Sequence, residues 1–529
     1  MKCFTLIFCN PVFRVCRVRL PAFYVSLLFG AACLPSADAE VRLAPGFSSG
    51  MVLQRDVPSR ISGWAAEGEK IQVQLGEHVV AEAVGRGEAA MWAVALPVFK
   101  AGSLPDLVIR GNNTITLTNL LAGDVWVCSG QSNMEMTLAK GPWCDYGGAQ
   151  DADKEVAAAN HPQLRLFNAR EPSGWIACTP ETARKFSAAA YFFGRDLSKD
   201  LGVPIGLVMA AVGGTAAEYW LPRSTLESRP GFAEAVTAAR LTLEELGPAD
   251  AAFRKALADW QKASKQAEAD GVPPPPKPVT TLDKDQQERM ASARVLENAG
   301  LYFAKRIEPL TAMPIKGAIW YQGEANITRH AEYADLMTRL IASWRKAWNQ
   351  EEMPFLIMQL VNFGSRAPAG DHLWAELRAA QQAVVDSVPN SGLAVGIDIG
   401  DPKNIHPANK QEVGRRLARL ALNLVYGREV VCSGPKPVDV RFEAGATVVE
   451  FDQPVVLQTG EESGFELADR EGVFHPAKAQ AGGNTIILST PEVPEPSEIR
   501  YAWRDNPAST VSNAEGLPAA PFRKGRQQP

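Results

Sequence analysis

Four short polar segments each follow an apolar run, and together they contain the residue types that nucleophilic catalysis needs. They are SGQSNM after residues 124–128, VGGT after 205–211, YQGEAN after 317–320 and DIGDPKNIHP after 393–397. A serine becomes a nucleophile when a general base lies within hydrogen-bond reach and N–H groups stabilise the oxyanion that forms. The segments therefore predict acyl-transfer chemistry, provided that the fold brings them together.

Ser132 stands between the apolar run 124–128 and the expected start of a helix at 134–139. Serine at such a junction is typically a helix N-cap, whose side-chain oxygen accepts a hydrogen bond from the first turn. A nucleophile at the same place uses the free N–H groups and partial positive charge of the helix end. The segment by itself favours the cap, so the choice depends on whether a base exists elsewhere.

The chain has six histidines, so the candidates for a general base can be enumerated. His406 follows an expected strand end, and Asp398 and Asp401 precede it, so either carboxylate could orient the imidazole. His372, at the expected start of a helix, is the second candidate. We expect His406 to be the base. The other histidines are His78, His161, His330 and His475.

Two further loops offer hydrogen-bond donors. Gly213 and Gly214 allow a backbone to approach a ligand closely, although a plain strand-to-helix turn explains them equally well. Gln322, Glu324 and Asn326 form a polar side-chain set, and the alternative is a loop that satisfies its own backbone.

The elements around these loops predict an α/β unit over residues 121–428. Strands alternate with helices, which is typical of a parallel sheet with helices on both faces. Ligands bind such sheets beyond the carboxyl ends of the strands, where all four polar segments lie. The charged helical stretch at about 226–298, interrupted by GVPPPPKPVTT, indicates an insertion.

Short alternating runs on both sides of this unit predict two β-rich modules. The first covers residues 40–120, and the second covers 429–529 together with a tail. A length of 529 residues is too great for one ordinary domain, in agreement with several units.

Residues 1–39 have the pattern of a secretory signal peptide. Three arginines precede LPAFYVSLLFGAACL, and an A-x-A sequence ends at Ala39, after which we expect cleavage. The apolar run is shorter than the roughly 20 residues of a membrane span. We therefore expect a secreted or periplasmic protein with no membrane contact after cleavage.

Several other classes of function lack their signals. The net charge of −5 gives no support for binding nucleic acid. No P-loop, no G-x-G-x-x-G after a strand and no Cys/His zinc spacing occurs, and Met134 occupies the last glycine position of a G-x-S-x-G elbow. We expect no metal and no cofactor. Cys144 and Cys178 could form a disulfide, but the four cysteines beyond residue 39 allow three pairings.

The segment GDVWVCSGQSNMEM resembles the nucleophile block of SGNH hydrolases, in the variant of sialate O-acetylesterases and related carbohydrate acetylesterases. The resemblance covers about residues 41–523 and comprises several blocks in the same order. The other blocks include LAPGFSSGMVLQRDVPSRISGWA, PIGLVMAAVGGTAAEYWL, PIKGAIWYQGEAN, DIGDPKNIHPANKQEVGRRLA and IRYAWRDNP.

This resemblance implies a flavodoxin-like sheet and a serine hydrolase that deacetylates O-acetylated sugars. Carried over residue by residue, it makes Ser132 the nucleophile and His406 the base. The oxyanion hole would consist of the amides of Ser132 and Gly214 with the region of Gln322. Further candidates for substrate contact or support are Gln131, Asn133, Glu324, Asn326 and Asp398.

One position departs from the family pattern, which places an aspartate three residues before the catalytic histidine. Lys403 stands there in this chain. Asp401 is our choice for the third group. The alternatives are Asp398, or a backbone carbonyl that would leave a dyad.

We therefore expect a secreted carbohydrate O-acetylesterase, most similar to sialate O-acetylesterases, whose partner is an O-acetylated glycan. An esterase acting on plant hemicellulose such as xylan or xyloglucan is the enzymatic alternative. A glycan-binding protein without catalysis is the alternative from another class, because two β-rich modules flank the sheet.

Overall fold

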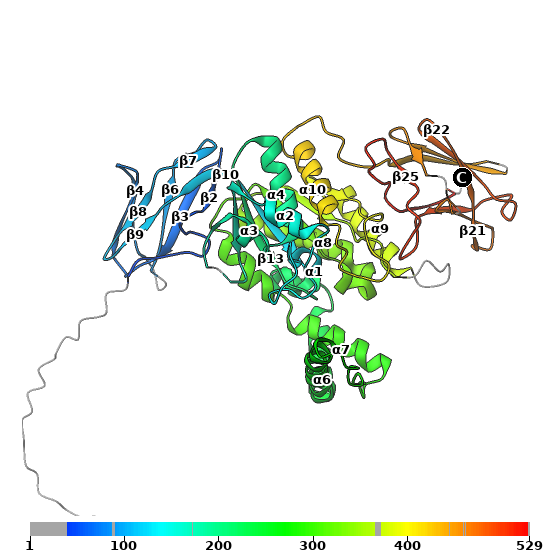
Figure 1. Cartoon of the computed structure of the whole chain (residues 1–529), viewed down its shortest axis with the longest axis horizontal. Coiled ribbons are helices and arrows are strands. Elements are labelled where there is room, and N and C mark those ends of the chain that lie inside the picture. Colours follow the sequence, from blue (N-terminus) through cyan, green and yellow to red (C-terminus); the bar gives the residue numbers. More distant parts are fainter. Residues whose placement is uncertain are drawn as a thin grey trace, which may run out of the picture. The chain divides into compact units, whose positions relative to one another are not determined.

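The structure, a computed structural model, describes residues 40–526 except 87–89, 172, 365–371, 444, 459 and 461. The expected signal peptide lies outside the described residues. The chain from Glu40 onward is one compact unit, and its elements are labelled in Figure 1.

Two antiparallel sheets form the N-terminal β-rich module, as the alternating pattern predicts. One sheet contains β1 (Arg42–Leu43), β3 (Ser59–Trp64) and β6 (Met91–Leu96) in that order. The other has the order β5 (His78–Val84), β4 (Lys70–Leu75), β8 (Leu107–Arg110) and β9 (Thr114–Leu117). Exposed and buried residues alternate along β6, as expected for a strand with one face on the core.

Strand β10 (Leu120–Gly130) belongs both to this module and to the central sheet. Its first residues pair with β2 (Val52–Gln54) and β7 (Gly102–Leu104). From Asp124 onward it pairs with strands of the central sheet instead. All eleven residues are buried, so the sequence boundary at residue 120 falls inside a continuous core strand.

The central sheet is parallel except for its edge strand β12 (Ile176–Cys178), which confirms the predicted α/β arrangement. The parallel strands, in their order across the sheet, are β11 (His161–Asn168), β13 (Ile205–Ala211), β10, β14 (Gly317–Tyr321), β15 (Phe355–Met358) and β16 (Ser391–Ala394).

The order of these strands places β10 at the point where the chain changes direction across the sheet. The two parallel strands that follow β10 in sequence, β11 and β13, lie on one side of it, and β14 to β16 lie on the other. Such a switch point leaves a crevice at the carboxyl end of the strand. Five of these strands, β13, β10, β14, β15 and β16, follow the order of a flavodoxin-like sheet, in which the first strand lies between the second and third. Strand β11 extends the sheet beyond β13.

Four long helices cover the two faces of the sheet. On one face α4 (Ala188–Leu201) and α10 (Lys410–Leu424) pack against alternate strand residues such as Cys128. On the other, α8 (His330–Trp348) and α9 (Leu373–Ser387) pack against the intervening residues. The shorter helices are α1 (Ser132–Glu135), α2 (Ala152–Ala158), α3 (Pro180–Ala183) and α5 (Arg223–Glu227).

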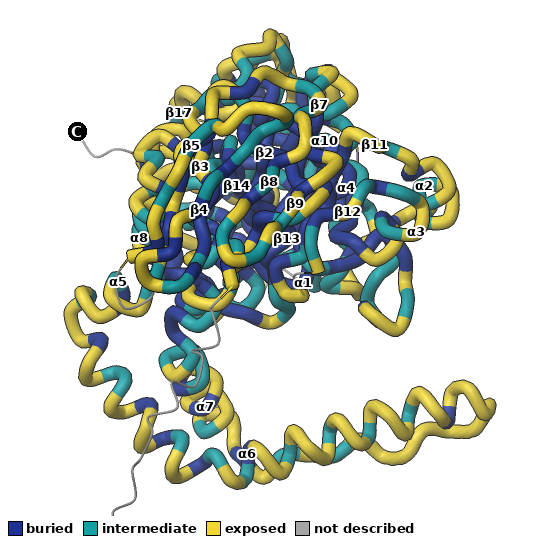
Figure 2. Tube along the Cα trace, turned by 90° about the vertical axis from the view of Figure 1, so that its left-hand side faces the viewer, coloured by how far each residue is buried: buried dark blue, intermediate teal, exposed yellow. Residues whose placement is uncertain are grey.

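The helical insertion consists of α6 (Phe232–Ala269) and α7 (Lys284–Glu297), close to the predicted bounds. Ion pairs from Arg289 to Glu245 and from Arg294 to Asp250 hold α7 against the first half of α6. Figure 2 shows that most of α6 is exposed along its length. The second half of this helix therefore has little core of its own.

The C-terminal module is β-rich, as predicted, and has its own apolar cluster. One sheet has the order β17 (Pro437–Glu443), β18 (Ala446–Phe451), β23 (Thr485–Ser489) and β22 (Lys478–Gly482). A second has β21 (Phe474–Pro476), β20 (Phe465–Ala468), β24 (Glu498–Tyr501) and β26 (Phe522–Gly525), and β19 (Val456–Leu457) pairs with β25 (Val511–Ser512).

The four described cysteines are all free thiols, so the disulfide considered between Cys144 and Cys178 is not present. Cys178 is buried in an edge strand, where its thiol contacts the carbonyl of Ala159 at 3.9 Å. Burial raises the pKa of the Cys178 thiol to about 12, which keeps it protonated and unreactive.

Candidate active site

Ser132 is the first residue of α1, directly after the buried end of β10. Gln131 occupies the N-cap position, so Ser132 is not the cap that the isolated segment favours. Gly130 permits the sharp turn: its φ is 137°, and a Cβ there would lie 2.1 Å from the carbonyl oxygen of Tyr321. The turn thus places Ser132 directly beyond the end of the strand.

The structure brings His406 onto Ser132. The imidazole Nε2 lies 2.8 Å from Ser132 Oγ, although 274 positions separate the two residues in the chain. His406 belongs to the loop between β16 and α10. His372, the second candidate, is instead the N-cap residue of α9. A hydroxyl and an imidazole at this distance form a nucleophile–base pair.

The pKa of His406 is lowered from its ordinary value, chiefly because the ring is half-buried. The positive charge of Lys410 lowers it further, while Asp145 and Glu135 act in the opposite direction. A lowered pKa keeps the imidazole neutral at neutral pH, which is the form that accepts a proton.

The glycine pair lies beside the nucleophile. A Cβ added to Gly213 would lie 3.4 Å from Ser132 Cβ, so the main chain passes close to the serine. Gly214 has a φ of 71° and is exposed, with no atom within 4 Å of an added Cβ. The N–H groups of Ser132 and Gly214 have no acceptor among the described residues. Both are therefore free to donate to a ligand.

Gln322 does not serve as a free donor, which corrects its expected place in the oxyanion hole. Its side chain is fully buried, and its Nε2 donates to the carbonyl of Thr215 and to Oδ1 of Asn326. Its Oε1 accepts from Tyr333. Asn326 is also buried and bonds to Ala217 N through the same Oδ1. Both amides therefore support the loops around the site from within.

Asn133 is hydrogen-bonded to Glu324, to the loop of His406 and to Lys410 on α10. Its Nδ2 donates to Glu324 Oε1 at 2.6 Å and to the carbonyl of Ile405 at 2.9 Å. Its Oδ1 accepts from Lys410 Nζ at 2.8 Å, and Lys410 also donates to the carbonyl of Pro407. The loop that carries the histidine is thus fixed to the residue after the nucleophile.

Two of these supporting residues are buried ionisable groups. Burial lowers the pKa of Lys410 to about 7, although the charge of Glu324 opposes that shift. Burial also raises the pKa of Glu324. Gln131 completes the support, because its Oε1 accepts from the N–H groups of Gly323 and Ala325. These residues position loops and do not face Ser132 Oγ.

Neither candidate aspartate accepts a hydrogen bond from His406 within the described part of the chain. Asp401 Oδ1 accepts from the backbone N–H groups of Lys403 and Asn404. Asp398 forms a two-point ion pair with Arg416, whose side chain is 4% exposed. The structure therefore gives both carboxylates other partners, and a third catalytic group stays a prediction.

Sequence reasoning does not identify three residues that surround the pair. Glu135 is one turn after Ser132 on α1, and Lys410 is four residues after His406. These spacings are weak signals, since charged residues are common on helices. Tyr146, whose ring stacks on His406, lies in an irregular loop with no periodicity. Its contact with His406 exists only in the folded chain, because the two residues are far apart in the sequence.

No cluster of three or more His, Cys, Asp or Glu residues suited to a metal ion occurs among the described residues. Among the residues that the structure describes, no helix is long and apolar enough to span a membrane. What the arrangement itself offers is a serine hydroxyl, a neutral imidazole and two free amides beyond the carboxyl ends of the parallel strands.

A family model described as carbohydrate esterase, sialic acid-specific acetylesterase, matches residues 122–253 and 297–423. The chain also resembles a solved structure over nearly its whole length. A carbohydrate acetylesterase from Xanthomonas citri is 31% identical with a TM-score of 0.73, and the match covers 92% of this chain and 100% of that one. The chain belongs to this family of carbohydrate esterases. It is accordingly a carboxylic ester hydrolase, and the alternative of a purely glycan-binding protein is set aside.

Two curated relatives extend the comparison of this carbohydrate esterase. The sialate O-acetylesterase of Mus musculus is 27% identical, and the match covers 95% of this chain and 97% of the relative. The human sialate O-acetylesterase is 25% identical, with coverage of 92% and 93%. The family match omits residues 254–296, which comprise the second half of α6, the linker and nearly all of α7.

Proposed function

We propose that this carbohydrate esterase removes O-acetyl groups from sialic acid-containing glycans, with Ser132 as nucleophile and His406 as general base. The 2.8 Å contact between Ser132 Oγ and His406 Nε2 carries the proposal. His406 takes the hydroxyl proton as Ser132 attacks the acetyl carbonyl, and then protonates the departing sugar oxygen. Water, activated by the same imidazole, hydrolyses the acetyl-enzyme and releases acetate.

The oxyanion of each tetrahedral intermediate is stabilised by the amides of Ser132 and Gly214 in this proposal. The turn that contains Gly213 and Gly214 passes close to Ser132, and both N–H groups are free within the described chain. Donors that are already in place cost no reorganisation when charge develops, and each contributes about 10²–10³ in kcat. The N-terminal end of α1 adds little, because the helix has only four residues.

The sialate preference is supported by the names of the curated relatives, which are sialate O-acetylesterases. Export is supported by the signal-peptide pattern of residues 1–39, with cleavage after Ala39. The protein would then meet its glycan outside the cytoplasm.

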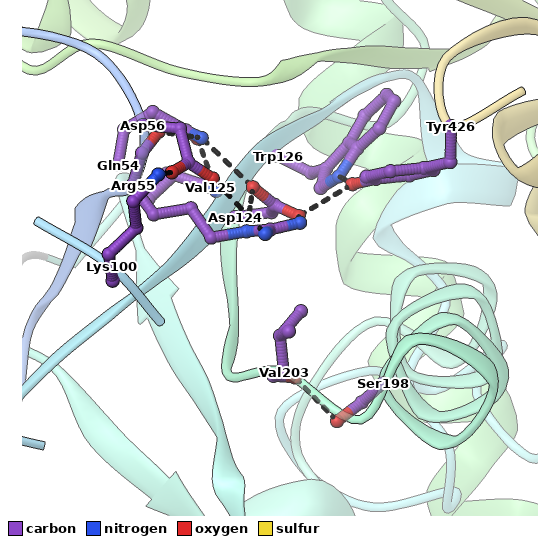
Figure 3. Close-up of polar contacts among 10 residues, drawn as sticks. All are labelled: Gln54, Arg55, Asp56, Lys100, Asp124, Val125, Trp126, Ser198, Val203 and Tyr426. Atoms are coloured by element: carbon purple, nitrogen blue, oxygen red, sulfur yellow. Dashed lines mark hydrogen bonds and ion pairs between the residues drawn. The ribbon is translucent and has the colours of Figure 1, made fainter. Parts of the chain in front are cut away.

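Acetate release from 9-O-acetylated sialic acid, acetylated xyloglucan and 4-nitrophenyl acetate tests the proposal. We expect Ser132→Ala to lower kcat about 10⁶-fold, the size of effect seen when a serine nucleophile is removed. Ser198→Ala is the matched control, because Ser198 lies on α4 and its hydroxyl donates to the carbonyl of Val203 (Figure 3). Full activity of Ser132→Ala would refute the assignment of Ser132 as nucleophile. A wild-type preference for acetylated xyloglucan over 9-O-acetylated sialic acid would refute the proposed sialate substrate.

A further inference from the structure

The imidazole of His406 is covered by an aromatic ring. The rings of Tyr146 and His406 are stacked, with centroids 4.4 Å apart and planes inclined by 20°. The edge of the imidazole that carries Nε2 remains directed at Ser132. A stacked ring restricts rotation of the imidazole about its side-chain bonds, so Tyr146 can fix the plane in which the base lies.

Tyr146 is itself anchored by Glu135. The phenol donates to Glu135 Oε2 at 2.5 Å, and the same carboxylate oxygen accepts from the N–H of Gly213 at 2.8 Å. The other oxygen, Oε1, pairs with Arg170. Since Glu135 is on α1, one carboxylate links the nucleophile's helix, the glycine turn and the ring on the base.

This linkage matters because no carboxylate holds the imidazole from its other side among the described residues. Asp401 bonds to backbone amides, and Asp398 pairs with Arg416. The main-chain N–H of His406 bonds to Asn404 Oδ1, which fixes the backbone and leaves the ring free to turn. Orientation of the imidazole therefore depends on the ring that covers it.

We propose that Glu135 and Tyr146 are positioning residues that hold the His406 imidazole and the Gly213–Gly214 turn in register with Ser132. The inference rests on the proposed roles of Ser132 and His406. It assigns to a carboxylate and a phenol, both acting through neighbours, the orienting task that a triad gives to an aspartate. Neither residue exchanges a proton with the substrate.

The first test compares Tyr146→Phe with Tyr146→Ala on 4-nitrophenyl acetate. Phenylalanine keeps the stacked ring and loses only the bond to Glu135, so we expect a kcat loss of about 10-fold or less. Alanine removes the ring, and we expect a loss of about 10² in kcat with KM nearly unchanged, because a misplaced reacting group costs about this much. Thermal unfolding of both variants checks that they fold.

The second test is the pH profile of kcat/KM. A general loss of structure would lower kcat/KM without moving the acid limb of this profile in a defined direction. Burial is the main cause that lowers the pKa of His406, so Tyr146→Ala should move the acid limb to higher pH. Glu135→Gln keeps an acceptor for Tyr146 and Gly213 but removes a charge that raises this pKa, so the limb should move lower. Lys410 and Asp145, the other charges that act on His406, are unchanged in both variants.

The outcomes separate this inference from the proposed function. Wild-type kcat and pH profile in folded Tyr146→Ala would overturn the positioning role, as would equal losses in Tyr146→Phe and Tyr146→Ala. If Ser132→Ala is inactive in the same assay, the proposed function stands in either case. If Ser132→Ala is active, the proposed function itself fails.

Discussion

His406 contacts Ser132 through Nε2, while the aspartates expected to orient it are bonded elsewhere. In a triad, replacing the orienting aspartate by asparagine costs about 10⁴ in kcat because the wrong tautomer is favoured. The chain therefore offers a direct comparison between a triad and a dyad.

We expect Asp401→Asn to retain kcat within about tenfold, far from the roughly 10⁴-fold loss of a triad. Asparagine Oδ1 can accept the same two backbone N–H groups that Asp401 Oδ1 accepts now. Steady-state kinetics on 4-nitrophenyl acetate measure the effect. A loss approaching 10⁴-fold would show that Asp401 reaches the imidazole during catalysis.

Asp398→Asn should act on stability more than on chemistry. The substitution leaves the buried guanidinium of Arg416 without its two-point partner, although Glu412 still lies 3.4 Å from Arg416 Nε. Asp398 is partly exposed, so we expect a loss of about 1–2 kcal/mol in the free energy of unfolding, below the range for fully buried pairs. Denaturant unfolding measures it, and unchanged stability with abolished activity would assign Asp398 a catalytic role.

Lys410 predicts a pH dependence of stability. Its pKa falls from 10.5 to about 7 on folding, so between these values the unfolded chain holds a proton that the folded chain has released. The free energy of unfolding should therefore rise with pH across this window, by about 1.4 kcal/mol per pH unit from this group. Below pH 7 both states are protonated, and the cost of burying the charge is fully present.

Urea unfolding at pH 7 and pH 9 of the wild type and of Lys410→Met measures this contribution. Between these pH values the free energy of unfolding should rise by about 2–3 kcal/mol less in the variant than in the wild type. Parallel changes in the two proteins would contradict the low pKa of Lys410.

At the scale of elements, a buried polar cluster holds β10 at Asp124, where its pairing with the central sheet begins. Asp124, 1% exposed, accepts from Gln54 Nε2, from Arg55 and from the hydroxyl of Tyr426 (Figure 3). Gln54 ends β2, and Tyr426 follows α10. The cluster thus joins the N-terminal module to the strand that leads to Ser132.

We expect Asp124→Ala to destabilise the protein by about 3–5 kcal/mol, because Arg55 and Tyr426 lose a buried partner. Five residues of strand lie between Asp124 and Gly130, so kcat of the folded variant should stay near that of the wild type. Denaturant unfolding and kinetics below the transition separate the two effects. A large fall in kcat at full stability would contradict this structural role.

Periodicity predicts the long elements, because their amphipathic faces are written in consecutive residues. The residue pattern predicts helices over residues 330–349 and about 411–426, and the structure has α8 and α10 there. The helix expected at 134–139 is wrong: α1 ends at Glu135 because Met136 takes an extended ψ of 120°. A four-residue helix has no periodic signal.

The sequence predicts which loops form the site, but it does not predict which side chains bond to one another there. Strand ends indicated that Ser132 and His406 would meet. Nothing local indicates that Gln322 donates to the carbonyl of Thr215, or that a tyrosine covers the base. Such partners depend on tertiary contacts between segments more than a hundred residues apart.

At the scale of the whole molecule, the second half of α6 and its return linker form a projection with little core. Trp260 Nε1 bonds to the carbonyl of Pro275 within this projection, and Lys265 reaches Asp145, the neighbour of Tyr146. The small apolar cluster that joins α6 to α7 lies outside residues 254–281, since it contains Leu246, Leu282 and Met290.

Replacing residues 254–281 by a short Gly-Ser linker should leave the thermal midpoint and the kcat for 4-nitrophenyl acetate close to the wild type. The apolar cluster and the ion pairs of α7 remain in this variant. Lys265→Ala in the full chain is the matched control for loss of the contact to Asp145 alone. Loss of folding on deletion would contradict a peripheral projection.

The shared strand β10 has a consequence for the order in which the chain acquires its structure. Residues 40–120 are synthesised before the central sheet. Strand β10 completes the edge of their module, and it also pairs with β13 and β14, which are made about 75 to 200 residues later. The part of β10 from Asp124 onward therefore stays unpaired until β13 and β14 have been made. A chain truncated before residue 317 should be retained by chaperones or cleaved, because the edge of β10 that pairs with β14 would stay unpaired.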